Sequence, residues 1–103
     1  MKLDFFQQER AFFKLKADLK SNAVALYFAL LHIANASSHE GGINQSFRVD
    51  NERLMHLSGI ASKKTLVSIR NVLCQRGFID YQSGGRFVDG RRNVGLYTLK
   101  KLY

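Results

Sequence analysis

Apolar residues recur at helical spacing in residues 62–77, and the other predicted elements can be placed relative to this segment. Leu66, Ile69 and Leu73 fall on one face of a helix. Ser62 suits the N-cap, where its hydroxyl accepts a hydrogen bond from a free backbone N–H. Gly77 suits the position just past the helix end, where a positive φ costs least. The pattern therefore predicts a helix that begins after Ser62 and stops before Gly77.

The opposite face of this predicted helix is polar and basic, and it carries no acidic residue. A helix that only faces solvent more often carries Glu–Lys pairs. A helix that enters a DNA groove must avoid carboxylates, because phosphates line both sides of the groove. We therefore favour a DNA-binding face over a solvated one. Its residues are Lys63, Lys64, Val67, Ser68, Asn71 and Gln75.

Residues 21–36 form a second helical pattern that is apolar on most sides, with Ser21 as the predicted N-cap. Such a helix should be the central helix of the domain or part of an oligomer contact. Its apolar stripe comprises Ala23, Leu26, Tyr27, Leu30, Leu31 and Ala34, and Val24, Phe28 and Ile33 widen it.

A mixed helical pattern covers residues 4–19, which contain four phenylalanines. These side chains need a place to be buried, because exposed aromatic patches of that size are uncommon in monomers. Two explanations are open: packing against the chain's own core, and an arm that packs across a dimer. The four residues are Phe5, Phe6, Phe12 and Phe13.

Residues 46–49 alternate like a short strand, and Asp50 is the predicted cap of a short helix over residues 51–57. This short helix should bury Leu54 and Leu57. A short helix, a glycine-containing turn and a longer polar-faced helix form the helix-turn-helix pattern.

After Gly77 the period changes, and residues 78–82 and 94–99 read as two strands. Asp89-Gly90 between them is a type I′ hairpin signal. The predicted hairpin would carry three arginines near its tip: Arg86, Arg91 and Arg92.

This order of elements predicts an α+β fold that is mainly α. We expect a winged helix-turn-helix with the β-hairpin as its wing and an extra N-terminal helix. Residues 1–20 should form an N-terminal helix or arm, and residues 21–103 the winged-helix DNA-binding domain.

Charge is distributed unevenly along the 103 residues. The net charge is +8, of which residues 59–103 carry +7, with nine basic and two acidic side chains. A one-sided positive field favours a polyanionic partner, and we expect double-stranded DNA rather than an anionic membrane. There is no apolar run of about 18 residues and no signal-peptide layout, so we expect a cytoplasmic protein.

Residue patterns that carry catalysis or bind metals are not recognisable. The single Cys74 has no second cysteine at metal-ligand spacing, and His39-Glu40 has no partner ligands. We find no nucleophile–base pair, carboxylate pair or phosphate-cradling glycine loop. We therefore expect no enzyme activity, no cofactor and no metal.

Several segments resemble the N-terminal winged-helix domain of phage replisome organisers and DnaD-like primosome proteins. The similarity covers roughly residues 20–100, and core spacing carries much of it. The matching segments are residues 21–35, 47–49, 54–60, 64–66, 70–73 and 77–81.

The resemblance implies an origin-binding or primosome-assembly factor that oligomerises and helps to load a helicase. It implies DNA contacts from Lys63, Lys64, Ser68 and Asn71, with Arg91 and Arg92 on the wing. Such proteins usually continue into a C-terminal domain and a flexible tail, whereas this chain stops at Tyr103, so an excised domain is one of two open interpretations. A helicase or helicase loader would then be a partner through a part outside it.

The leading hypothesis is a DNA-binding domain of a replication initiation protein that self-associates through its N-terminal helix region. In this hypothesis the basic helix enters the major groove, and the hairpin arginines contact the adjacent DNA backbone or the minor groove. The alternatives are a winged-helix transcriptional repressor, and an oligomerisation or protein-interaction module that meets an acidic partner. The expected DNA-binding residues are Ser62, Lys63, Lys64, Val67, Ser68, Asn71, Gln75, Arg86, Arg91 and Arg92.

Overall fold

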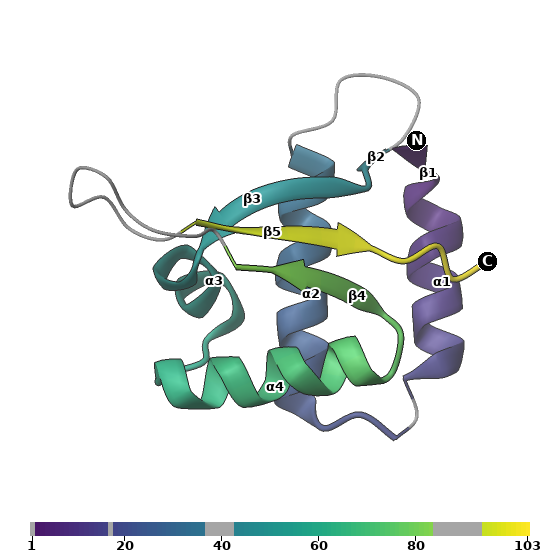
Figure 1. Cartoon of the computed structure of the whole chain (residues 1–103). Coiled ribbons are helices and arrows are strands. Elements are labelled where there is room, and N and C mark those ends of the chain that lie inside the picture. Colours follow the sequence, from purple (N-terminus) through teal and green to yellow (C-terminus); the bar gives the residue numbers. More distant parts are fainter. Residues whose placement is uncertain (1, 17, 37–42, 84–93) are drawn as a thin grey trace.

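Helices dominate the computed structural model, which describes residues 2–16, 18–36, 43–83 and 94–103 and is α+β (Figure 1). In this part of the chain, four helices accompany a three-stranded antiparallel sheet and a short two-stranded one. The elements are β1 (Lys2–Leu3), α1 (Phe5–Leu15), α2 (Ser21–Ala36), β2 (Ile43–Asn44), β3 (Ser46–Asp50), α3 (Asn51–Ser58), α4 (Lys63–Gln75), β4 (Ile79–Gln82) and β5 (Val94–Leu99).

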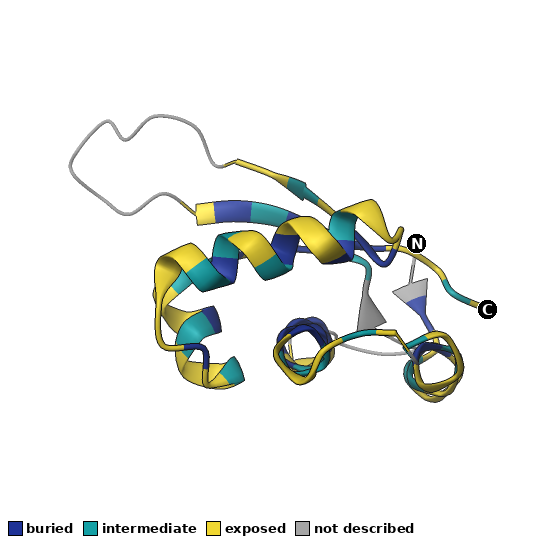
Figure 2. Cartoon of the chain, turned by 90° about the horizontal axis from the view of Figure 1, so that it is seen from below, coloured by how far each residue is buried: buried dark blue, intermediate teal, exposed yellow. Residues whose placement is uncertain are grey.

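The larger sheet has the strand order β3-β5-β4, so the last strand inserts between the two earlier ones. Its register pairs Phe47 with Tyr97 on one side of β5 and Tyr81 with Tyr97 on the other. The helix α2 lies behind this sheet in Figure 1, α4 crosses below it, and α1 stands beside α2 on the side away from α3. Figure 2 shows the same arrangement from below.

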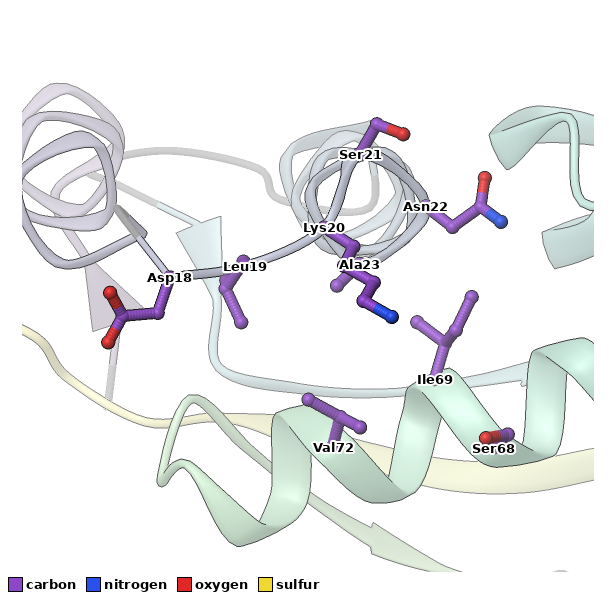
Figure 3. A pocket seen from close by; sticks show the side chains of 9 residues that line it. All are labelled: Asp18, Leu19, Lys20, Ser21, Asn22, Ala23, Ser68, Ile69 and Val72. Carbon is purple, nitrogen blue, oxygen red and sulfur yellow. The ribbon is translucent and has the colours of Figure 1, made fainter.

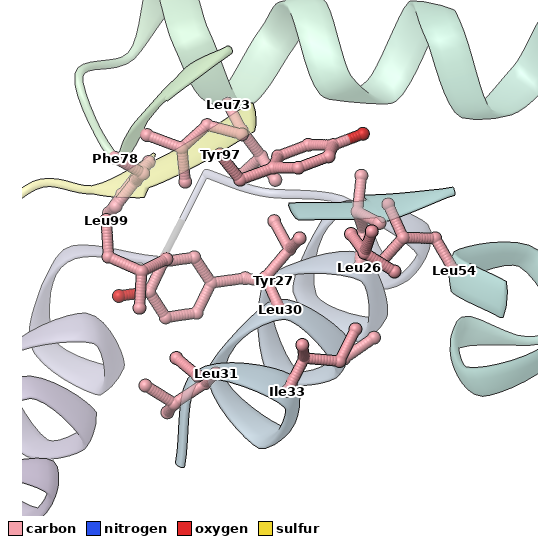
Figure 4. Packing of buried hydrophobic residues seen from close by; sticks show 14 of the residues in the cluster. Leu26, Tyr27, Leu30, Leu31, Ile33, Leu54, Leu73, Phe78, Tyr97 and Leu99 are labelled. Carbon is pink, nitrogen blue, oxygen red and sulfur yellow. The ribbon is translucent and has the colours of Figure 1, made fainter. Parts of the chain in front are cut away.

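The core forms between α2 and the sheet, as the apolar stripe of residues 21–36 predicts. Leu26, Tyr27 and Leu30 are fully buried and face Tyr97 and Leu99 of β5 (Figure 4). All six residues of the predicted stripe are buried, and so is Ile33. The prediction of a central helix is confirmed because α2 is covered by the sheet on one side and by its neighbouring helices on others.

The first helix packs against the chain's own core, which resolves part of the ambiguity over its phenylalanines. Phe12 is fully buried and stacks on Tyr27 with 3.8 Å between ring centroids. Phe6 and Phe13 lie on another face and remain 71% and 53% exposed. The helix begins at Phe5, where Asp4 caps it by accepting a hydrogen bond from the Gln7 N–H, and it ends at Leu15, before the predicted end at residue 19.

A buried glutamine ties this helix to the segment after β5. The Gln8 amide is fully buried and donates from Nε2 to the Tyr27 hydroxyl at 2.8 Å and to the Lys100 carbonyl at 2.7 Å. Its Oε1 accepts from the Leu102 N–H at 3.2 Å. Residues more than 90 positions apart are thereby joined inside the core, and α1 is an integral part of the fold.

Local capping signals in the second half of the chain are confirmed. The Asp50 carboxylate accepts from the Arg53 N–H at 2.7 Å at the start of α3, and the Ser62 hydroxyl accepts from the Thr65 N–H at 3.1 Å at the start of α4. Gly77 has a φ of +80° just past α4, as its position predicts. Each cap acts between residues three positions apart, which is why the sequence alone reveals it.

Three local expectations were wrong or incomplete. Ser21 is the first residue of α2 and not its N-cap, since the N–H groups of Ala23 and Val24 already bond to the Lys20 carbonyl. Leu57 is 40% exposed, although it stands three residues after buried Leu54 in α3. The strand β2 falls in a segment of loop composition, and its pairing with β1 depends on a distant part of the chain.

The buried phenol of Tyr27 predicts a loss of stability in alkali. Burial raises its pKa from 10.0 to about 12, although the hydrogen bond from Gln8 opposes this shift. Between pH 10 and pH 12 the unfolded chain therefore binds fewer protons than the folded one, so stability falls as the pH rises. The contribution is complete below pH 10, and about 2–3 kcal/mol should be lost by pH 12.

Urea unfolding at pH values on either side of 10 measures this loss. The Tyr27→Phe variant removes the titrating group and should show a flatter dependence over the same range, which separates Tyr27 from other groups that titrate in alkali. An equally steep dependence in both proteins would contradict the prediction.

Over the described residues, no helix combines the length and the apolar character that crossing a membrane requires.

Candidate nucleic-acid interface

The helix α4 is held against the core by its apolar side, so its orientation is determined by packing. Leu66 and Leu73 are fully buried, and Ile69 is half-buried. The chain enters the helix through buried Ile60 and the Ser62 cap. These contacts leave the opposite side of α4 facing outward, on the surface that Figure 2 shows from below.

The outward side of α4 carries most of the residues predicted to bind DNA. Ser62, Lys63 and Lys64 are exposed at its N-terminal end. Ser68, Asn71 and Gln75 continue this surface along the helix, and Val67 is half-buried beside them. No acidic residue occurs anywhere in α4. The predicted residues of the helix therefore share one surface, which offers two ammonium groups, hydroxyls and amides.

The three arginines of the predicted hairpin lie outside the described residues. Arg86, Arg91 and Arg92 therefore stay predictions, as does the turn at Asp89-Gly90. The strands on either side of this segment are described: β4 ends at Gln82 and β5 begins at Val94.

A buried arginine on the inner side of α4 is the functional residue that the sequence analysis missed. Arg70 is only 7% exposed, and its Nη1 donates to Asn51 Oδ1 at 3.1 Å and to the Tyr97 hydroxyl at 3.0 Å. Its guanidinium lies over the Tyr81 ring, 3.8 Å from the centroid. Arg70 thus links α4 to α3 and to both strands of the β4–β5 pair.

The position of Arg70 in the helix gave a signal that could have revealed it. Arg70 stands four residues after Leu66 and three before Leu73, so it belongs to the buried stripe of the helix. A cation in such a stripe must find partners inside the protein. Those partners come from three other elements, and only the fold identifies them.

The β4–β5 pair is also fitted closely around this arginine. Gly95 in β5 lies directly under the Tyr81 ring, and a Cβ at that position would overlap ring atoms. Tyr81 and Tyr97 contact each other at 4.9 Å between centroids. Burial raises the pKa of the Tyr97 hydroxyl, although Arg70 opposes the shift. The two strands are therefore positioned relative to α4 by one arginine and two tyrosines.

A hollow of about 410 Å³ adjoins α4 on the side of the α2 N-terminus (Figure 3). Ser68, Ile69 and Val72 of α4 form one wall. The Lys20 side chain points into the hollow from the opposite wall (Figure 3). Lys20 thus adds a cation next to the outward side of α4 that the sequence analysis did not assign to the interface.

One carboxylate also borders this hollow. Asp18 is highly exposed and lies 3.5 Å from the Arg76 guanidinium, just past the end of α4. An exposed pair of this kind contributes little to stability. It does, however, reduce the positive charge at the C-terminal end of α4, so Lys63 and Lys64 make the N-terminal end the more positive one.

Chemistry other than binding finds little support in the described part of the chain. No group of three or more His, Cys, Asp or Glu side chains there is placed to hold a metal ion. Burial raises the pKa of the Cys74 thiol, although Arg70 opposes the shift. A raised pKa disfavours the thiolate, which is the nucleophilic form of cysteine.

Comparison of the chain with protein-family models, curated proteins and solved structures gave no match.

Proposed function

We propose that the chain is a winged-helix DNA-binding domain of a replication initiation or primosome-assembly protein. Its recognition helix is α4 and its wing is the hairpin between β4 and β5. The order α2, β3, α3, α4, β4, β5 and the insertion of β5 between β3 and β4 support this fold. The role in replication follows from the resemblance to phage replisome organisers and DnaD-like proteins.

The observation that carries the DNA-binding proposal is the exposed, carboxylate-free side of α4. Its polar groups suit a major groove: ammonium groups meet phosphates, and the Asn71 amide pairs with a base edge. The Ser62 hydroxyl caps the Thr65 N–H and leaves other backbone N–H groups of the first turn open to a ligand. The start of a helix favours a phosphate at this position. Lys20 extends the phosphate-contacting surface across the adjoining hollow.

Salt-dependent binding to duplex DNA tests this proposal. If about five cations neutralise phosphates, log K should fall against log salt concentration with a slope of about −4 to −5. Fluorescence anisotropy with a labelled duplex over a range of salt concentrations measures the slope. A slope near zero would remove the proposal, since uncharged contacts release no counterions.

A second candidate function, self-association, is favoured by the exposed phenylalanines of α1. Phe6 and Phe13 are 71% and 53% exposed on one face, and the Phe13 ring contacts Phe28 of α2 at 5.5 Å between centroids. Aromatic side chains of this size dominate interface energetics. This face would associate with a second copy of the chain while α4 stays free for DNA.

Replacing Phe6 by serine should weaken self-association about tenfold, because one aromatic side chain is then lost from each interface half. Phe6 has one described ring contact, with Phe5, so the variant should stay folded. Sedimentation velocity over a range of protein concentrations measures the effect. Val94→Ser, at an exposed apolar residue of β5, is the control and should associate like the wild type. A wild type that stays monomeric at every concentration would contradict this function.

The transcriptional repressor would use the same DNA-binding surface, so residues do not separate it from the replication protein. Footprinting does, because an origin with repeated sites and a promoter operator give different patterns. A helicase or helicase loader is the partner proposed for the replication role.

A further inference from the structure

A cleft between α1 and the segment after β5 lies away from the N-terminal end of α4, at the opposite end of the molecule (Figures 1 and 2). Its volume is about 470 Å³, and it is open to solvent. Arg10 and Lys14 stand four residues apart on α1 and line it with the Tyr103 ring. Its lining is completed by Gln7, Ala11 and Leu102.

The segment that forms the second wall is held in place by specific hydrogen bonds. The Leu102 N–H donates to buried Gln8, and the Tyr103 hydroxyl accepts from the Asp4 N–H at 2.7 Å. The Tyr103 ring, 41% exposed, is thus presented at the surface by contacts at both ends of the segment. A fixed aromatic ring loses little conformational freedom when a ligand stacks on it.

The charges around the cleft are mainly positive. Arg10 and Lys14 are exposed, and the Lys101 ammonium lies 4.8 Å from the centroid of the Tyr103 ring. No Asp or Glu side chain is among the residues lining the cleft. Asp4 precedes α1 and caps it through the Gln7 N–H, and Glu9, the acidic residue within α1, is not among the residues lining the cleft. The cleft therefore combines cations on one wall with an aromatic ring on the other.

We propose that this cleft is a second nucleic-acid site that binds a single strand, with a base on Tyr103 and its phosphates on Arg10 and Lys14. Single-strand sites combine a positively charged groove with aromatic side chains on which bases stack. A duplex keeps its base faces stacked inside the helix, so it offers the ring nothing comparable. This inference does not rest on α4, and it goes beyond the proposed duplex-binding function.

Binding of a labelled oligothymidylate to the chain, followed by fluorescence anisotropy, tests the proposal. Tyr103→Ala should weaken binding about tenfold, because one base loses its stacking partner. Tyr103→Phe keeps the ring and should bind within about twofold of the wild type. Arg10→Gln and Lys14→Gln should each make the salt slope shallower by about 0.7. These two exposed substitutions keep the test decisive if Tyr103→Ala fails to fold.

Two control variants separate the cleft from the rest of the surface. Lys16→Gln removes the same charge from the end of α1, away from the residues lining the cleft, and should bind like the wild type. Lys64→Gln should weaken duplex binding and leave oligothymidylate binding unchanged. A wild-type chain that binds oligothymidylate but not duplex DNA would overturn the proposed function alone.

Three results would overturn the single-strand site: no binding of oligothymidylate by the wild type, wild-type affinity in both Tyr103→Ala and Arg10→Gln, or a larger loss in Lys64→Gln than in Arg10→Gln. A polyglutamate peptide that displaces the labelled oligothymidylate as well as the unlabelled oligothymidylate does at equal concentration would also overturn it. That outcome would show an acidic protein segment to be the ligand, since a peptide of carboxylates does not need the ring.

Discussion

The double charge reversal Lys63→Glu/Lys64→Glu should weaken duplex DNA binding about a hundredfold at physiological salt. Both side chains are exposed at the N-terminal end of α4, where the proposed groove contact begins. The change removes two phosphate-neutralising cations and places two carboxylates against the phosphates. It should leave the melting temperature nearly unchanged, because neither residue is buried. Anisotropy titration with a labelled duplex and thermal unfolding measure the two effects.

Single charge reversals of equal size provide the control for this prediction. Lys64→Glu should weaken duplex binding about tenfold, whereas Lys16→Glu at the end of α1 should change it by about twofold at most. Arg91→Glu tests in the same assay whether the predicted hairpin contributes to duplex binding. Loss in both Lys64→Glu and Arg91→Glu supports binding by helix and wing together. Unchanged binding in both variants would contradict the DNA interface and favour the association module.

Replacing buried Gln8 by leucine should destabilise the fold by about 3 kcal/mol or more. The substitution leaves three groups without their partner: the Tyr27 hydroxyl, the Lys100 carbonyl and the Leu102 N–H. A buried polar group without a partner costs about 1–3 kcal/mol, and here the Tyr27 hydroxyl is buried while the Lys100 carbonyl and the Leu102 N–H are part-buried. For a domain of this size the melting temperature should fall by about 15 °C. Differential scanning calorimetry measures the change.

The neighbouring glutamine offers a matched control, since Gln7 is exposed on the same helix. Gln7→Leu makes the same chemical change and should alter stability by about 0.5 kcal/mol at most. Equal stability of the two variants would contradict the role of Gln8 in joining α1 to the segment after β5. A loss in Gln8→Leu alone confirms that the first helix contributes to the core of the folded chain.

Helix starts and stops were readable from the sequence because each depends on residues a few positions apart. Asp50 and Ser62 bond to N–H groups three residues later, and Gly77 takes a positive φ next to the helix that it ends. The buried faces of α2 and α4 were likewise predictable, since they follow from the helical repeat. The outward side of α4, with Lys63 and Lys64, was inferred in the same way.

Contacts between distant segments could not be read from local patterns. The pairing of β1 with β2 and the exposure of Leu57 depend on where other elements lie in space. The joining of α1 to the core by Gln8 involves residues 19 to 94 positions away. Loop composition and helical spacing hold no information on such partners, because they describe only neighbours along the chain.

By itself the sequence determined the boundaries of α3 and α4 closely, the apolar faces of α2 and α4 and the basic side of α4, because backbone hydrogen bonding and side-chain periodicity act over a few residues. The tertiary structure alone decided which polar groups are buried and what surrounds them. Gln8 looks like an ordinary surface residue in the sequence, and the position of Arg70 in its helix indicates burial but not its partners. Both side chains are enclosed and bonded to distant segments. Burial removes water as a partner, so such groups must find replacements across the fold, and only the assembled chain supplies them.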